Sequence, residues 1–135
     1  MKTHARLCAA LSLALLSSSA LACGDEAALY SRAYDQCMDA AVSTAAMQDC
    51  IAAEHGKQDK TLNDNYRKLM AALAKPRQPQ LLAAQRLWLQ YRDANCRLYA
   101  DPDGGTAAAL AAADCALAAT AARAAELAKL LPEQH

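Results

Sequence analysis

Residues 80–106 read QLLAAQRLWLQYRDANCRLYADPDGGT, and this stretch decides the fold class. Residues 80–99 have the period of an α-helix, because polar and apolar positions recur at steps of three and four. One face of this helix carries Leu81, Gln85, Trp88, Arg92, Cys96 and Tyr99. The segment Asp101–Gly105 then predicts a loop, because proline, glycine and aspartate favour turns. Thr106 is a candidate N-cap for a returning helix, so the stretch predicts a helical hairpin.

Two further segments precede this hairpin and have the same period. A first helix is expected over about residues 25–41, and a second over about residues 44–74. The dipeptide His55–Gly56 either bends the second helix or separates it into two. Pro76 and Pro79 are expected to end it in a tight connection.

The last helix is expected to follow Thr106 and to stop at Pro132. The chain has no phenylalanine, only 4 glycines and 4 prolines, and abundant alanine. This composition favours helices over sheets. The sequence therefore predicts an all-α fold, a three- to four-helix antiparallel bundle with short loops. Because most apolar positions are alanine, the core is expected to be thin.

The first 22 residues have the pattern of a secretory signal peptide. Lys2 and Arg6 precede an apolar run over residues 7–16, and the segment ends in Ala20-Leu21-Ala22. The apolar run is shorter than the roughly 20 residues that span a bilayer. We therefore expect export, to the periplasm or cell envelope of a bacterium, where disulfides are permitted.

The cysteines support this prediction by their number. Of the 6 cysteines, Cys8 lies in the signal segment, and the remaining five cannot all pair internally. Cys23 follows small residues, as the lipid-modified cysteine of a lipoprotein does, so we expect a lipid on Cys23 and no other attachment to a membrane. The alternative is a secreted protein with one free thiol. The other four cysteines predict two disulfides, and the simplest pairing is Cys37–Cys50 and Cys96–Cys115. Spacing alone leaves the other two pairings open.

Charge and residue usage exclude several classes of function. The 14 basic and 14 acidic residues balance, and no clustered basic stripe indicates nucleic-acid binding. No two cysteines have the close spacing of zinc ligands, so no metal or other cofactor is expected. Beyond the signal segment the only histidines are His55, read as a surface residue, and the terminal His135. Asp101 and Asp103 lie on a turn, which is a poor scaffold for paired catalytic carboxylates. The sequence does not predict an enzyme.

Polar residues on the apolar face of the helix over 80–99 need an explanation. Arg92 directed toward a core requires partners, because an unpaired buried charge costs several kcal/mol. Candidate partners lie on the second and fourth helices: Asn63, Tyr66, Thr120 and Arg123. Two interpretations remain open, a structural network that fixes the register of the helices and a shallow binding site.

Four runs along the chain form a pattern. They are Asp59-x-x-Leu62-Asn63-x-x-Tyr66, Ala84-Gln85-x-x-Trp88-x-x-Tyr91-Arg92-Asp93-x-x-Cys96, Gly104-Gly105-Thr106, and Cys115-x-x-x-x-Thr120-x-x-Arg123-x-x-x-Leu127. With the upstream pair Cys37 and Cys50, this pattern resembles the LprI-type lysozyme inhibitor domain. The resemblance covers about residues 37–131. It implies a small, exported, helical and disulfide-bonded domain, whose signature residues look more like scaffold than like a contact surface. The polar members of the signature are Asp59, Asn63, Tyr66, Gln85, Trp88, Arg92, Asp93, Thr120 and Arg123.

The chain then divides into a signal peptide (1–22), a lead-in with the first helix (23–36), an LprI-like domain (37–131) and a tail (132–135). The resemblance implies an envelope protein that binds and inhibits a cell-wall lytic enzyme, with lysozyme as the expected partner. Animal-type lysozymes are strongly basic, so acidic residues are expected at the contact. The expected contact is the loop that contains Asp101, Asp103, Gly104 and Gly105. The alternative is a lipid-anchored structural or interaction module of the envelope, one that protects against a toxin effector, with no lysozyme inhibition.

Overall fold

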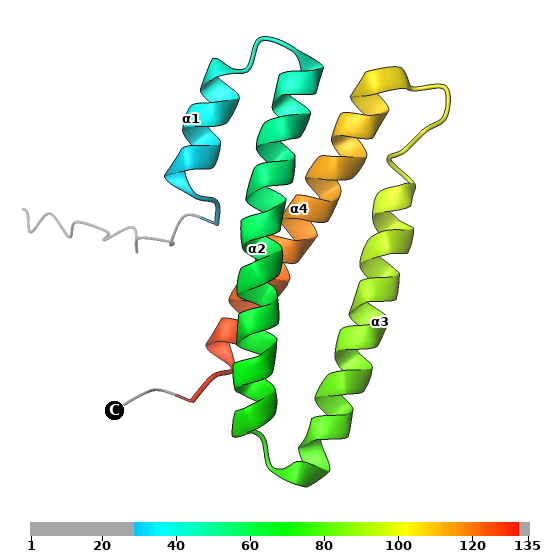
Figure 1. The fold of residues 1–135 in the computed structure, drawn as a ribbon. Coiled ribbons are helices and arrows are strands. Elements are labelled where there is room, and N and C mark those ends of the chain that lie inside the picture. The colour runs from blue at the N-terminus through cyan, green and yellow to red at the C-terminus, as the bar shows by residue number, and fades with distance from the viewer. Residues whose placement is uncertain (1–28, 133–135) are drawn as a thin grey trace, which may run out of the picture.

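The computed structural model describes residues 29–132 and contains four α-helices that run alternately up and down (Figure 1). Their bounds are α1 Arg32–Ala40, α2 Thr44–Ala72, α3 Gln78–Arg97 and α4 Gly105–Lys129, with a short 3-10 turn, η1 Lys75–Arg77, between α2 and α3. No β-strand occurs within residues 29–132. The all-α prediction and the four-helix arrangement are confirmed. The expected signal segment, Cys23 and residues 25–28 of the first helix lie outside the described residues.

The helices do not pack equally. α4 packs against α2 along much of its length, whereas α3 contacts α4 more sparsely and α1 rests on α2. The side chains that α4 buries are Leu117, Thr120, Ala121, Ala124 and Leu127. Because two of them are alanines, the axes of α2 and α4 can approach closely. α4 is therefore the helix around which the other elements assemble.

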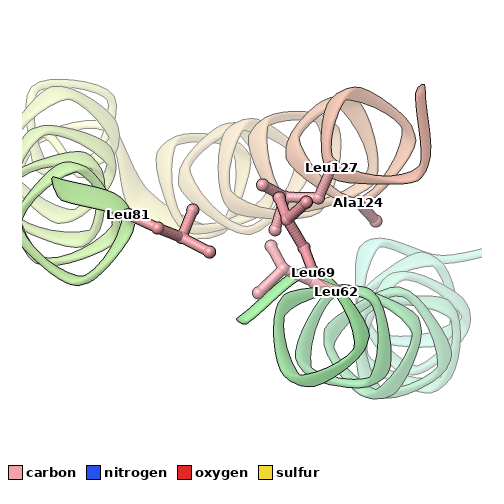
Figure 2. Close-up of a cluster of buried hydrophobic side chains, with 5 residues drawn as sticks. All are labelled: Leu62, Leu69, Leu81, Ala124 and Leu127. Carbon is pink, nitrogen blue, oxygen red and sulfur yellow. The ribbon is translucent and has the colours of Figure 1, made fainter. Parts of the chain in front are cut away.

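A cluster of large apolar side chains lies near the α2–α3 connection. Leu62 and Leu69 of α2 meet Ala124 and Leu127 of α4, and Leu81 reaches in from α3 (Figure 2). Partly buried hydrophobic residues surround this cluster: Tyr66, Met70, Leu73, Trp88 and Leu131. We refer to residues 56–91 and 121–132, which contain this cluster, as the leucine end.

Both disulfides lie at the opposite end, with the α1–α2 turn and the α3–α4 loop (Figure 1). Cys37–Cys50 joins α1 to α2, and Cys96–Cys115 joins α3 to α4. The simplest pairing expected from the sequence is confirmed. We refer to residues 29–54 and 93–119 as the disulfide end. Each cross-link closes a short loop and is expected to contribute about 3 kcal/mol in the chain-entropy account.

Several helix boundaries differ from those expected. α2 continues without interruption through His55 and Gly56, because the helix packs on both sides of this point and absorbs the roughly 1 kcal/mol penalty of one glycine. Thr106 lies inside α4 and does not cap it, since the helix begins at Gly105, whose φ of 60° turns the chain. Pro79 does not end α2. It occupies the first turn of α3, where a proline needs no hydrogen-bond partner.

α4 is also long and apolar enough to cross a membrane, judged by length and composition alone. The core helix of a globular bundle meets the same criterion. In this fold α4 carries five buried side chains against its neighbours, and its Cys115 is bonded to α3. These contacts attach α4 to the rest of the bundle.

Candidate functional site

A layer of hydrogen bonds crosses three helices at mid-height and separates the two ends. Its centre is Thr120 of α4, which is fully buried. The Nε2 atom of His55 on α2 lies 3.1 Å from Thr120 Oγ1, and Nη1 of Arg92 on α3 donates to the same oxygen over 3.3 Å. His55 therefore contributes to the interior, contrary to its interpretation as a surface residue. It went unrecognised because its sequence neighbours are polar.

Trp88 continues this layer toward the leucine end. The guanidinium of Arg92 lies 5.2 Å from the centre of the indole ring, and that of Arg123 lies 5.9 Å from it. Arg123 Nε also donates to Oε1 of the buried Gln85 over 3.1 Å. Cation–π contacts of partly desolvated arginines stabilise such an arrangement by about 0.5–2 kcal/mol.

The charges of these arginines are balanced by carboxylates at the surface. Arg92 Nη2 lies 2.8 Å from Oδ1 of Asp93, and Arg123 Nη1 lies 2.8 Å from Oε2 of Glu126. Within residues 29–132 no buried side-chain nitrogen or oxygen lacks a hydrogen-bond partner. Because each buried polar side-chain atom already has a partner within the protein, these contacts favour the interpretation as a structural network.

The second-helix members of the polar signature lie elsewhere. Asn63 donates to the backbone oxygen and to Oδ2 of Asp59, on the exposed side of α2. Tyr66 packs against the cluster of buried apolar side chains at the leucine end. The contact between α2 and α4 is made instead by Asn65, whose amide donates to the backbone oxygen of Ala124 over 2.9 Å. The expected pairing of Arg92 with Asn63 and Tyr66 is therefore wrong, because Asn63 lies on another face of α2 and Tyr66 lies about three turns beyond His55, in the apolar cluster.

Glu54 forms a second polar site that sequence reasoning missed. Its side chain is only 1% exposed, yet its carboxylate accepts four hydrogen bonds. Ser31 donates from its backbone nitrogen (2.9 Å) and its hydroxyl (2.6 Å), Gln58 donates from Nε2 (2.8 Å), and Lys57 Nζ lies 3.5 Å away. Ser31 also caps α1, so Glu54 ties the start of α1 to the middle of α2. The available signal was that Glu54 lies three residues after the buried Ile51, on the same helical stripe.

The environment of Glu54 sets the direction of its pKa. Burial raises the pKa of the Glu54 carboxyl, but the hydrogen bonds from Ser31 and Gln58 and the nearby charge of Lys57 outweigh burial and leave the pKa below its ordinary value of 4.5. A carboxyl with a depressed pKa in the folded state stabilises the fold above its unfolded-state pKa. That stabilisation is lost as the pH falls through the folded-state value.

We expect Glu54→Gln to lower the free energy of unfolding by about 1–3 kcal/mol at neutral pH, because the amide leaves part of a buried hydrogen-bonded set unsatisfied. We also expect the difference from the wild-type protein to start shrinking as the pH falls below 4.5, the ordinary pKa, and to shrink further as the pH falls through the lower folded-state pKa of Glu54. Urea unfolding between pH 3 and pH 7 measures both effects. Asp49→Asn, on the exposed side of α2, is the matched control. A constant difference across this range would contradict the assignment.

The two ends of the molecule carry opposite charge. The disulfide end has two basic residues, Arg32 and Arg97, against eight acidic ones, a net charge of −6. These acids are Asp35, Asp39, Asp49, Glu54, Asp93, Asp101, Asp103 and Asp114. The leucine end has nine basic and three acidic residues, a net charge of +6, with Arg92 in the layer between. The near-zero charge of the whole sequence conceals this segregation, which arises because the antiparallel helices bring distant segments together (Figure 1).

The α3–α4 loop is the most acidic exposed turn of the disulfide end. Oδ1 of Asp101 accepts a hydrogen bond from the backbone nitrogen of Asp103 over 3.0 Å, which shapes the turn. Gly104 packs closely beside Ala108, where a Cβ atom would lie only 2.6 Å from the alanine methyl. Asp101, Asp103, Gly104 and Gly105 are all exposed, so the loop presents two carboxylates to solvent on a fixed backbone.

Residues 29–132 contain no group of three or more histidine, cysteine, aspartate or glutamate side chains placed to hold a metal ion. The four cysteines of this part of the chain form cross-links, and its buried polar side-chain atoms all have hydrogen-bond partners. These features define a small, disulfide-bonded helical domain whose interior is scaffold.

Comparison with known families identifies the family of this chain. The family model for lysozyme inhibitor LprI matches residues 37–127, so the protein belongs to the lysozyme inhibitor LprI family. The resemblance seen in the sequence is confirmed. No curated protein and no solved structure matches the chain. The family is named for an inhibitor of lysozyme and not for an enzyme, and membership of it, together with the two disulfides, suggests an extracytoplasmic location.

Proposed function

We propose that this protein binds and inhibits lysozyme or a related cell-wall lytic enzyme in the bacterial envelope, and that its disulfide end makes the contact. The observation that carries the proposal is the net charge of −6 at that end, in a chain of the lysozyme inhibitor LprI family. Animal-type lysozymes are strongly basic, and an acidic surface attracts and orients a basic partner.

The cross-links suit this role. Both disulfides lie at the end that carries the acidic surface. Each one joins the two helices that flank a connection, Cys37–Cys50 at the α1–α2 turn and Cys96–Cys115 at the α3–α4 loop, and so restricts its motion. A surface that is already rigid loses little conformational entropy on binding. The disulfide end is therefore suited to present charges in a fixed geometry.

The location is part of the proposal. Disulfides form and persist in oxidising compartments such as the bacterial periplasm. The signal segment over residues 1–22 and the lipid on Cys23 stay predictions, and they favour a periplasmic protein or an outer-membrane lipoprotein. A lipid on Cys23 would leave the bundle free to meet a lytic enzyme close to the cell wall.

We expect the exported, fully oxidised protein to protect a peptidoglycan suspension from lysis by animal-type lysozyme in a saturable, stoichiometric manner. Asp101→Lys combined with Asp103→Lys is expected to slow association about tenfold, because charges at the edge of an interface act mainly on the association rate. Lysis measured by turbidity, and association measured by surface plasmon resonance at two salt concentrations, test both expectations.

Two variants serve as controls for the loop. Asp101→Asn with Asp103→Asn removes the charge but keeps an oxygen acceptor for the turn, and should have a smaller effect. Asp59→Lys with Asp64→Lys makes the same change in net charge at the leucine end and should leave association unchanged. Unchanged association after the loop substitution would remove the loop from the contact. No protection by the folded wild-type protein would contradict inhibition and leave the alternative of an envelope interaction module.

A further inference from the structure

Two shallow grooves run along the part of α4 that belongs to the disulfide end, and they share one charged residue. The first groove lies between α3 and α4 and is lined by Tyr91, Asn95 and Tyr99 with small residues of α4. The second lies between α4 and the α1–α2 pair and is lined by Met38, Ile51 and Leu110. Ala111 and Asp114 line both grooves. Asp114 is therefore a carboxylate on a ridge between two largely apolar depressions.

The side chain of Asp114 has no salt bridge and no hydrogen bond to any group of residues 29–132. Its side chain is exposed. By contrast, Asp93 pairs with Arg92 and Asp101 accepts a hydrogen bond within its turn. The folded chain thus leaves the negative charge of Asp114 available to a partner, in the middle of a surface with few other polar groups.

Tyrosines border this ridge on both sides. Tyr91 and Tyr99 of the first groove are 65% and 51% exposed, which is high for aromatic side chains. On the side of α1, Tyr30 and Tyr34 stack edge to face with ring centres 5.0 Å apart. Burial raises the pKa of both phenols and the carboxylate of Asp114 raises it further, so Asp114 lies near them and both are neutral donors at physiological pH. Exposed tyrosines around a central charge are typical of the energetically dominant part of a protein interface.

We propose that the ridge of Asp114, with Tyr91 and Tyr99 beside it, is the anchor point at which a basic lytic enzyme docks, and that it receives an arginine or lysine side chain of that enzyme. The inference rests on the proposed function and names the surface through which it acts. Charge complementarity favours a basic occupant, because the disulfide end carries −6 and Asp114 is an unpaired carboxylate that lies between apolar walls. The tyrosine rings shield the pair from water and pack on the aliphatic part of a cationic side chain.

This assignment separates two roles at the same end of the molecule. The α3–α4 loop attracts the partner from a distance, whereas the ridge holds it after contact. A substitution on the ridge is therefore expected to act on the dissociation rate, and a substitution in the loop on the association rate.

The test measures binding of purified animal-type lysozyme to the exported protein by surface plasmon resonance, together with protection in the lysis assay. Asp114→Lys is expected to weaken binding at least tenfold, mainly through faster dissociation. Tyr91→Ala with Tyr99→Ala is expected to weaken it about tenfold without any change in charge. Thermal unfolding of each variant confirms that the bundle remains intact, since all three side chains are exposed.

Asp49→Lys is the matched control, because it makes the same charge change at the same end. Asp49 lies two residues before Ile51 and so faces away from the second groove on α2. If Asp49→Lys weakens binding as much as Asp114→Lys, the effect is one of net charge and the ridge is not the anchor. If the wild-type protein protects and Asp114→Lys leaves both rates unchanged, the inference fails while the proposed function stands. If the wild-type protein neither binds nor protects, the proposed function fails and the inference falls with it.

Discussion

Replacing both Cys96 and Cys115 with alanine is expected to lower the free energy of unfolding by about 3 kcal/mol, because the unfolded chain regains the freedom that a short closed loop had removed. Loss of this disulfide should also change the structure more than loss of a typical disulfide does. α3 buries only Leu81, Gln85 and Cys96, so its half nearest the loop has no other buried residue. Without the disulfide, that half of α3 is expected to separate from α4.

Urea unfolding gives the stability, and amide hydrogen exchange shows where protection is lost. Protection should fall in residues 91–104 while α2 stays protected. The matched variant replaces Cys37 and Cys50, and it should release α1, which has no fully buried residue, and leave α3 in place. A loss below 1 kcal/mol, or equal loss of protection in α2, would show that α3 is held by contacts other than this cross-link.

Leu127→Ala is expected to lower the free energy of unfolding by about 2–5 kcal/mol, the range for removal of a fully buried leucine. Leu127 is 0% exposed and lies in the leucine cluster between α2 and α4 (Figure 2). The neighbouring side chain of Ala124 is too small to fill the cavity that the substitution would leave. A domain of this size has a total stability of about 5–15 kcal/mol, so this one side chain accounts for a large part of it.

Thermal and urea unfolding measure the effect, and each kcal/mol should lower Tm by about 4–8 °C in a domain of this size. Leu130→Ala is the control, because Leu130 is three residues away, at the C-cap of the same helix, and 57% exposed. It should change the stability by no more than about 0.5 kcal/mol. Equal losses in the two variants would contradict the position of the core.

The helices could be predicted from the sequence because they depend on local information, and the simplest disulfide pairing proved to be the right one, although spacing alone left two others open. A period of three to four residues specifies a helix, and a cysteine near each side of a short loop can meet its partner only if the flanking helices are antiparallel. The residues at which the helices begin could not be predicted in the same way. Ser31 caps α1 and Gly105 opens α4 through a positive φ, and neither choice follows from the hydrophobic pattern.

The polar groups of the interior could be predicted only in part. Gln85, Trp88 and Arg92 lie on the predicted face of α3 and meet Thr120 and Arg123 of α4. The expected partners on α2 were wrong because Asn63 lies on an exposed face of the helix and Tyr66 lies about three turns beyond the network, in the apolar cluster. Glu54 was missed because a carboxylate indicates a solvent-exposed position unless its donors are known, and two of its four donors belong to Ser31, 23 residues earlier.

The opposite charges of the two ends have a consequence for how the molecule acts in solution. The 29 residues of α2 form a helix about 44 Å long, whereas the Debye length at physiological ionic strength is about 8 Å. The positive charge of the leucine end is therefore screened before its field reaches the disulfide end. A basic protein that approaches the disulfide end experiences a strongly acidic surface, although the isoelectric point of the whole chain lies close to neutrality.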